Sequence, residues 1–82
     1  MFINRANGRN NICGKAIAQI RKDLRISQRE LADRLQINGL DIDKNAVQRI
    51  ESGQRFVTDI EIVHFSKALS VSIEDLIGGK SQ

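Results

Sequence analysis

The stretch from Ser27 to Glu51, SQRELADRLQINGLDIDKNAVQRIE, contains two helical patterns separated by a short connection. Ser27 is a favourable N-cap, and Glu30 follows three residues later, which is the spacing of a capping box. These two residues predict that a helix begins directly after Ser27. The helix is expected to end at Asn38-Gly39, because glycine readily adopts the left-handed conformation that closes a helix.

A second helix follows this connection. Asp43 is its candidate N-cap, since a short acidic side chain can accept a hydrogen bond from the first turn. Val47 and Ile50 are three residues apart and mark the inward face of a helix over about Lys44 to Ser52. The second helix is therefore short, and its inward face is apolar.

The outward face of the second helix is polar. Lysine and arginine can donate to O6 and N7 of guanine, and asparagine and glutamine can pair with N6 and N7 of adenine. Such a face is suited to base edges in the major groove of DNA, although an ordinary solvated helix surface has a similar composition. The polar residues are Lys44, Asn45, Gln48 and Arg49.

The start of the preceding helix favours the DNA interpretation. Its first turn contains Gln28 and Arg29, and the free backbone amides and the dipole at a helix start attract phosphate oxygens. A helix-turn-helix divides its work in this way, because phosphate contacts fix the register while the second helix reads the bases.

Three further helices are predicted around this stretch. Apolar residues at three- and four-residue spacings indicate a helix from Gly14 to Arg25. Thr58 and Glu61 repeat the capping-box spacing and begin another helix, and Ser72 begins a short last helix that ends at Gly78-Gly79. The predicted fold is all-α, a single bundle of five helices.

The composition agrees with one small folded domain. The 82 residues include no proline, 40% are hydrophobic and 28% are charged, and no run is long and apolar enough to span a membrane. The first residues lack the apolar segment of a secretory signal, so we expect a cytoplasmic protein. We expect a flexible arm over residues 1–11, the folded domain over 12–79 and a frayed tail over 80–82.

Charge is distributed unevenly along the chain. Residues 1–29 contain seven basic residues and one acid, whereas the remaining residues are net acidic. A basic segment of this kind suits a phosphate backbone. Arg5, Arg9, Asn10 and Asn11 in the expected arm are of a type that contacts phosphates or the minor groove, with plain disorder as the alternative.

The sequence contains few candidates for catalysis or metal binding. Cys13 is the only cysteine, so no internal disulfide or cysteine-based zinc site is possible. We expect it to be a small apolar residue near a helix start, with a redox-sensitive thiol as the alternative. His64 has no cysteine or acidic partner at a metal-ligand spacing and is expected to be an ordinary surface or half-buried residue. With no triad, metal cluster or glycine-rich phosphate loop, we expect no enzyme, no metal, no cofactor and no small-molecule ligand.

Three segments in order resemble the XRE family, the phage-repressor and Cro-like helix-turn-helix domains. They are IRKDLRISQRELADRL, NAVQRIESGQR and FSKALSVSIEDLI, and the resemblance extends over residues 12–77. It implies a five-helix, lambda-repressor-like bundle. It also implies that Gln28 and Arg55 contact phosphates. Arg29 is expected to contact phosphates as well, from its place at the same helix start. The implied base-reading residues are Lys44, Asn45, Gln48 and Arg49, of which Asn45 and Arg49 are our first choices.

The resemblance further implies two structural roles. Arg21 and Glu51 occupy positions where many relatives form a partly buried ion pair, and we expect such a pair here rather than a DNA contact by Arg21. Phe56 and Val57 lie where related repressors often make a two-fold contact. Covering of the core by both side chains is the alternative.

The connection inside the helix-turn-helix departs from the common pattern. Between Leu35 and Glu51 the chain is longer than the short form of the motif by about five residues, approximately the segment INGLDI. Its apolar side chains suggest that the first helix is extended by about a turn and that the return is buried, with Leu40 and Ile42 as buried connectors. The first residue of the second helix is therefore open by one or two positions.

We therefore expect a sequence-specific DNA-binding transcriptional regulator, a repressor that binds a palindromic operator in double-stranded DNA as a homodimer. The alternative is an antitoxin or a protein-interaction adaptor that uses the same fold, because a fold alone does not determine function.

Overall fold

Polar side chains begin four of the five helices in the computed structural model, which describes residues 8–78. In each of the four, the side-chain oxygen of the N-cap accepts the backbone N–H three residues later. These N-caps are Ser27, Asp43, Thr58 and Ser72. The helices are α1 (Gly14–Asp23), α2 (Gln28–Ile37), α3 (Lys44–Glu51), α4 (Asp59–Leu69) and α5 (Ile73–Ile77).

The predicted all-α class, the five helices and the predicted N-caps are confirmed. The end of α1 was predicted at Arg25 and was wrong by two residues. Arg25 has a φ of 61°, and its N–H donates to Lys22 O while the N–H of Ile26 donates to Arg21 O. These two bonds close the helix at Asp23.

Glycines end α2 and α3 by the same geometry. Gly39 has a φ of 98° and Gly53 a φ of 85°, both in the region that glycine enters most easily. Gly39 N and Leu40 N donate back to carbonyl oxygens in the last turn of α2. The last helical residue of α3 is Glu51, one before the predicted end, with Ser52 as its C-cap.

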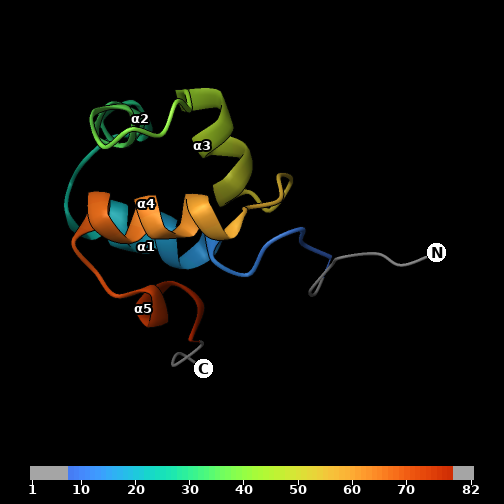
Figure 1. Cartoon of the computed structure of the whole chain (residues 1–82). Helices are drawn as coiled ribbons and strands as arrows, with labels where there is room; N and C mark the ends of the chain where they lie inside the picture. Colours follow the sequence, from blue (N-terminus) through green and yellow to red (C-terminus); the bar gives the residue numbers. More distant parts are fainter. Residues whose placement is uncertain (1–7, 79–82) are drawn as a thin grey trace.

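The helices pack around one apolar core. Figure 1 shows α2 and α3 at one end of the molecule, α1 and α4 across the middle and α5 at the other end. Every helix contributes to this core, so the position of α3 is fixed by packing as well as by its own hydrogen bonds. The largest fully buried side chains are Phe65, Ile17, Leu31, Leu35, Ile50, Leu76 and Val47.

The α2–α3 connection returns to the core as expected, with one exception. Ile42 is buried and Leu40 is half-buried, and Gln36 Nε2 donates to Ile42 O at 3.0 Å. Ile37, by contrast, is 86% exposed at the end of α2, because its helical position faces away from the core. The extra residues of the connection therefore bring the chain back to the core, but Ile37 is left exposed to solvent.

The expected flexible arm is only partly within the described residues. Residues 1–7 lie outside them, as do 79–82, which include the expected tail. Arg9, Asn10 and Asn11, which we expected in the arm, instead bond to the end of α3 and the loop after it. Within residues 8–78, no helix has the length and apolar character needed to cross a membrane.

Candidate nucleic-acid interface

The outward face of α3 is polar and accessible. Val47 and Ile50 are fully buried, and this fixes the rotation of the helix about its axis. The side chains on the opposite face of α3 lie about one turn apart and therefore point to solvent together. All four are exposed, and within residues 8–78 no hydrogen bond or ion pair engages them. They are the predicted base-reading residues Lys44, Asn45, Gln48 and Arg49.

The ion pair between Arg21 and Glu51 is present in the structure. Arg21 Nε donates to Glu51 Oε2 at 2.7 Å and Arg21 Nη2 to Glu51 Oε1 at 3.1 Å, so the contact is bidentate. The side chains are only 11% and 8% exposed. Arg21 Nη1 also donates to Ile26 O at 2.8 Å, so all three guanidinium nitrogens of Arg21 bond within the protein.

Gln28 joins this network. Its Nε2 donates to Glu51 Oε1 at 3.0 Å, so its side chain supports the end of α3 in this structure. A phosphate contact by Gln28 would therefore use its backbone N–H. Ser27 and Glu30 form the capping box that fixes this helix start, with Ser27 Oγ accepting Glu30 N and Glu30 Oε1 accepting Ser27 N.

Arg29 lies beside the start of α3. It is exposed, and it lines a cleft of about 310 Å³ between α2 and α3 together with Lys44. Two cations at this junction suit a phosphate oxygen, although Asp33 and Asp43 line the same cleft and offset part of the positive charge. The structure thus places the predicted phosphate residue Arg29 next to a predicted base-reading residue.

Arg55, predicted to contact phosphate, pairs with a carboxylate in the structure. Its Nη1 and Nη2 donate to Glu61 Oε1 and Oε2 at 3.1 and 3.0 Å, and its side chain is 34% exposed. Burial of the Glu61 carboxyl opposes ionisation, but the bonds from Arg55 and from Thr58 lower the pKa of Glu61 below its ordinary value. A phosphate would have to compete with a carboxylate that is already charged and paired.

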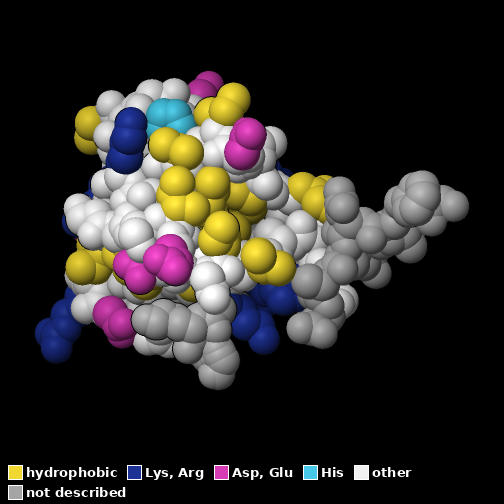
Figure 2. Space-filling model, turned by 60° about the horizontal axis from the view of Figure 1, so that its bottom comes forward, with side chains coloured by type: hydrophobic (Ala, Val, Ile, Leu, Met, Phe, Trp, Pro, Cys, Tyr) yellow, Lys and Arg dark blue, Asp and Glu magenta, His cyan; other side chains and the backbone are white. Residues whose placement is uncertain are grey.

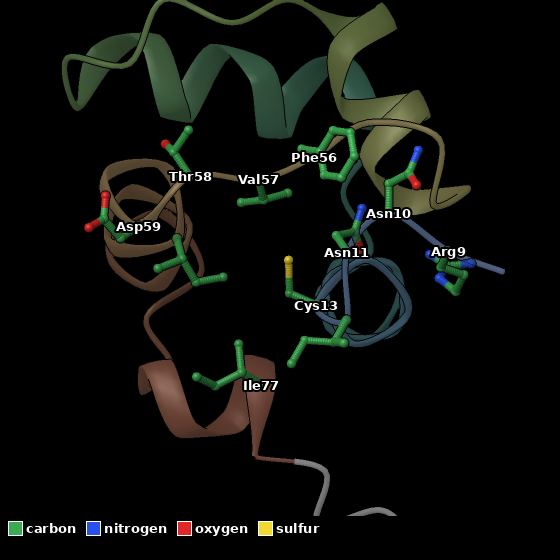
Figure 3. Close-up of a pocket in the computed structure, with 11 residues that line it drawn as sticks. Arg9, Asn10, Asn11, Cys13, Phe56, Val57, Thr58, Asp59 and Ile77 are labelled. Atoms are coloured by element: carbon green, nitrogen blue, oxygen red, sulfur yellow. The ribbon is translucent and has the colours of Figure 1, made fainter. Parts of the chain in front are cut away.

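A groove lies between the N-terminal segment, the loop from α3 to α4, α4 and α5, and the four polar residues of the outward face of α3 do not line it. Its volume is about 490 Å³, and Figure 3 shows Val57, Cys13 and Ile77 facing one another across it. Phe56 at its rim is 52% exposed, whereas Val57 packs against the core. Val57 therefore covers the core, which was the alternative to a two-fold contact. Phe56 is a candidate for contact with another molecule.

Two single residues stay outside the interface. Cys13 is 3% exposed at the start of α1, and burial raises the pKa of its thiol to about 11, so little thiolate exists at neutral pH. This agrees with the apolar interpretation rather than the redox one. His64 is half-buried, and its Nδ1 has no hydrogen-bond partner among the described residues.

Sequence reasoning missed the residues that hold the carboxyl end of α3 from outside the helix-turn-helix. Asn11 Nδ2 donates to Ile50 O at 2.9 Å and to Arg55 O at 2.8 Å, and Arg9 Nη2 donates to Glu51 O at 2.7 Å. Their acceptors are backbone oxygens about forty residues away, which no local spacing reveals. The one sequence signal available is an asparagine, Asn11, three residues before the start of α1.

Comparisons with known proteins agree with this geometry. The sequence matches the helix-turn-helix family over residues 17–76. The fold is similar to that of the restriction-modification controller protein C.AhdI from Aeromonas hydrophila, with a TM-score of 0.68 and 30% identity, over 78% of this chain and 89% of that chain. No curated protein matches the sequence significantly. The chain belongs to the XRE family of helix-turn-helix proteins and is a DNA-binding regulator of transcription.

Proposed function

We propose that this regulator binds a specific operator sequence, with α3 in the major groove and the start of α2 on the phosphate backbone. The observation that carries the proposal is the outward face of α3, where four exposed side chains are free of partners within residues 8–78. A buried face and an ion-pair network hold the same helix in place. Free donors on a rigidly held helix are what base recognition requires.

Asn45 and Arg49 are the proposed principal readers. They are four residues apart and therefore neighbours on one face of α3. The amide of Asn45 can form two hydrogen bonds with adenine, and the guanidinium of Arg49 can form two with guanine. Lys44 and Gln48 flank them and would extend the contact to adjacent base pairs.

The phosphate contacts come from the start of α2. The backbone amides of Gln28 and Arg29 stand in the first turn, where no intrahelical acceptor is available, and Arg29 adds a positive charge. Arg55 would contribute only by sharing its guanidinium with Glu61. We therefore assign the larger share of backbone contact to the α2 start.

We infer that two copies bind together through the groove formed by the N-terminal segment, α4 and α5. Figure 2 views the molecule from this side and shows hydrophobic side chains gathered on the surface. Exposed apolar patches of this kind mark interaction sites. A two-fold contact here would present two reading helices about 34 Å apart to a palindromic operator. The exposed large apolar residues that line the groove are Ile12, Phe56 and Ile77.

Repression is the mode of regulation we propose. A dimer bound across a promoter occupies the DNA that a polymerase needs, and this requires no further activity of the bound protein. Regulation by the controller C.AhdI concerns a restriction-modification system, as its name states, and we extend only the DNA-binding mode to this chain.

Selection from random double-stranded DNA tests the proposal. The protein should enrich one sequence, and Asn45→Ala or Arg49→Ala should weaken binding to it by about 1–3 kcal/mol, roughly 5- to 150-fold, because each loses a bidentate base contact. Fluorescence anisotropy at two salt concentrations provides the affinities. Asn38→Ala is the matched control, since it also truncates an exposed asparagine but at the end of α2.

The outcome also separates the alternative function. Enrichment that the α3 variants abolish and Asn38→Ala preserves supports sequence-specific recognition. Weak binding to every sequence, with the same steep salt dependence, would overturn it, because only phosphate charge would then be recognised. That result would favour a protein-interaction module built on the same fold.

A further inference from the structure

Residues Arg9, Asn10 and Asn11 form a clamp on the carboxyl end of α3 and the loop that follows it. Arg9 Nη2 donates to Glu51 O, and Asn11 Nδ2 donates to both Ile50 O and Arg55 O. Between these contacts, Asn10 N donates to Gly53 O at 2.8 Å and Asn10 Nδ2 to Gln54 O at 2.9 Å. The clamp, defined as residues 9–11, thus binds every carbonyl from 50 to 55 except that of Ser52.

The clamp supplies donors where the helix lacks them. The last carbonyl groups of a helix have no partner within it and carry partial negative charge. Asn11 adds a second donor to Ile50 O, which Gly53 N also contacts at 3.1 Å. The guanidinium of Arg9 places a positive charge at this negative helix end, which is the favourable orientation.

Asn11 connects two helices at once. It is 8% exposed, and its Oδ1 accepts Gly14 N at 2.8 Å, so the same amide begins α1 and holds the end of α3. Cys13, the N-cap position of α1, makes no side-chain cap bond. The side-chain amide of Asn11 therefore makes three hydrogen bonds, and all three are to backbone groups.

Two glycines allow the close approach. A Cβ at Gly14 would lie 2.1 Å from Ile50 O, which no packing tolerates, and this backbone oxygen cannot move without moving α3. A Cβ at Gly53 would lie 2.8–2.9 Å from the side chain of Arg9. The close fit thus needs a missing side chain on each side, at Gly14 beside the clamp and at Gly53 after α3.

Position matters for this helix because the readers Lys44 and Asn45 lie at the end opposite to the clamp. A helix of eight residues at about 1.5 Å per residue is roughly 12 Å long, and a tilt of about 10° at one end moves the other by about 2 Å. Hydrogen bonds to base edges tolerate much less than that. The N-terminal half of α3 is held mainly by the packing of Val47 and by the exposed cap Asp43, whereas the carboxyl end also receives side-chain hydrogen bonds from Arg9, Asn11 and Arg21.

We propose that Asn11, assisted by Arg9 and Asn10, is a positioning residue for operator recognition. It sets the orientation of α3 and so determines where Asn45 and Arg49 reach the bases, without touching DNA itself. This inference rests on the function proposed above.

The test compares discrimination rather than affinity alone. For Asn11→Ala, the ratio of the dissociation constants for random and enriched DNA should fall by about tenfold or more, because misplaced readers lose at least one base contact. The slope of affinity against salt should be unchanged, since a buried neutral side chain neutralises no phosphate. Both are measured at a temperature where circular dichroism shows the variant fully folded.

Asn38→Ala is the matched control for this substitution. It also removes an asparagine Nδ2 that donates to a helix-end carbonyl, Arg34 O at 2.9 Å, but on α2. Its discrimination ratio should stay near that of the wild type. If Asn11→Ala proves unfolded, Arg9→Gln replaces it, because Arg9 is half-buried and loses a single bond to α3. Lys15→Gln then controls for the lost charge, since Lys15 is exposed on α1.

The possible results are distinguishable. A reduced ratio for the clamp variant, with the control unchanged, supports the proposal. A variant that is less stable yet discriminates as well as the wild type overturns it, because its role would then be structural only. If the wild type itself enriches no sequence, the proposed function fails, and the positioning role fails with it.

Discussion

At the scale of single residues, Glu51 connects the reading helix to three other parts of the chain. Its carboxylate accepts from Arg21 on α1 and from Gln28 on α2, and its backbone oxygen accepts from Arg9. A buried ion pair adds little net stability relative to apolar side chains of the same size, because desolvation offsets the attraction. The main effect of Glu51 is therefore to hold the carboxyl end of α3 in place against α1 and α2.

Breaking this pair should cost far more than the pair contributes. Glu51→Leu would leave the guanidinium of Arg21 buried without a counterion, and the free energy of unfolding should fall by about 3–5 kcal/mol. Urea unfolding followed by circular dichroism measures the change.

Two variants check the cause. The double variant Arg21→Met with Glu51→Leu should recover much of the loss, because no unpaired charge remains. Glu61→Gln should cost less than Glu51→Leu, since its partner Arg55 is about one-third exposed and glutamine can still form the capping box. A Glu51→Leu variant as stable as the wild type would contradict a buried, charge-dependent pair.

At the scale of helices, the sequence predicts the helix starts, because a helix start depends on residues within one turn. Ser27 with Glu30 and Thr58 with Glu61 are visible as capping boxes because both partners lie three residues apart. The end of α1 was missed, because Arg25 is not a residue type that usually adopts positive φ.

Contacts between residues far apart in the sequence were predictable only where the family resemblance implied them. The pair Arg21–Glu51, 30 residues apart, was anticipated in this way. The clamp was not, because Asn11 and its acceptor Arg55 O are 44 residues apart and a backbone oxygen is present at every position. The partner of Arg55 also became known only from the structure, because Arg55 lies in a loop six residues before Glu61, and this separation is not a helix spacing.

At the scale of the whole molecule, two different surfaces lie on separate elements. The helices α2 and α3 lie at one end of the molecule, whereas α5 lies at the other end (Figure 1). The apolar groove is formed by the N-terminal segment, the loop from α3 to α4, α4 and α5, and none of the four reading residues of α3 lines it. Pairing through the groove would thus leave the reading face of each copy accessible.

The proposed pairing predicts a concentration-dependent dimer. Sedimentation equilibrium should show a species of twice the 9.2 kDa chain mass, and Phe56→Ser should shift the protein toward monomer because the exposed ring is lost from the groove rim. Ile37→Ser is the matched control, since Ile37 is 86% exposed but does not line the groove. A wild-type monomer at every concentration, or equal effects of both substitutions, would argue against this interface.

The central claim is that the free polar face of α3 enters DNA, and one titration tests it most directly. The ¹⁵N-labelled protein is observed by NMR while a duplex carrying the enriched sequence is added. We predict that the largest shifts occur at the backbone amides of residues 44–49 and at the side-chain amides of Asn45 and Gln48, with α5 little changed. Largest shifts on α4 and α5, with α3 unchanged, would contradict the claim.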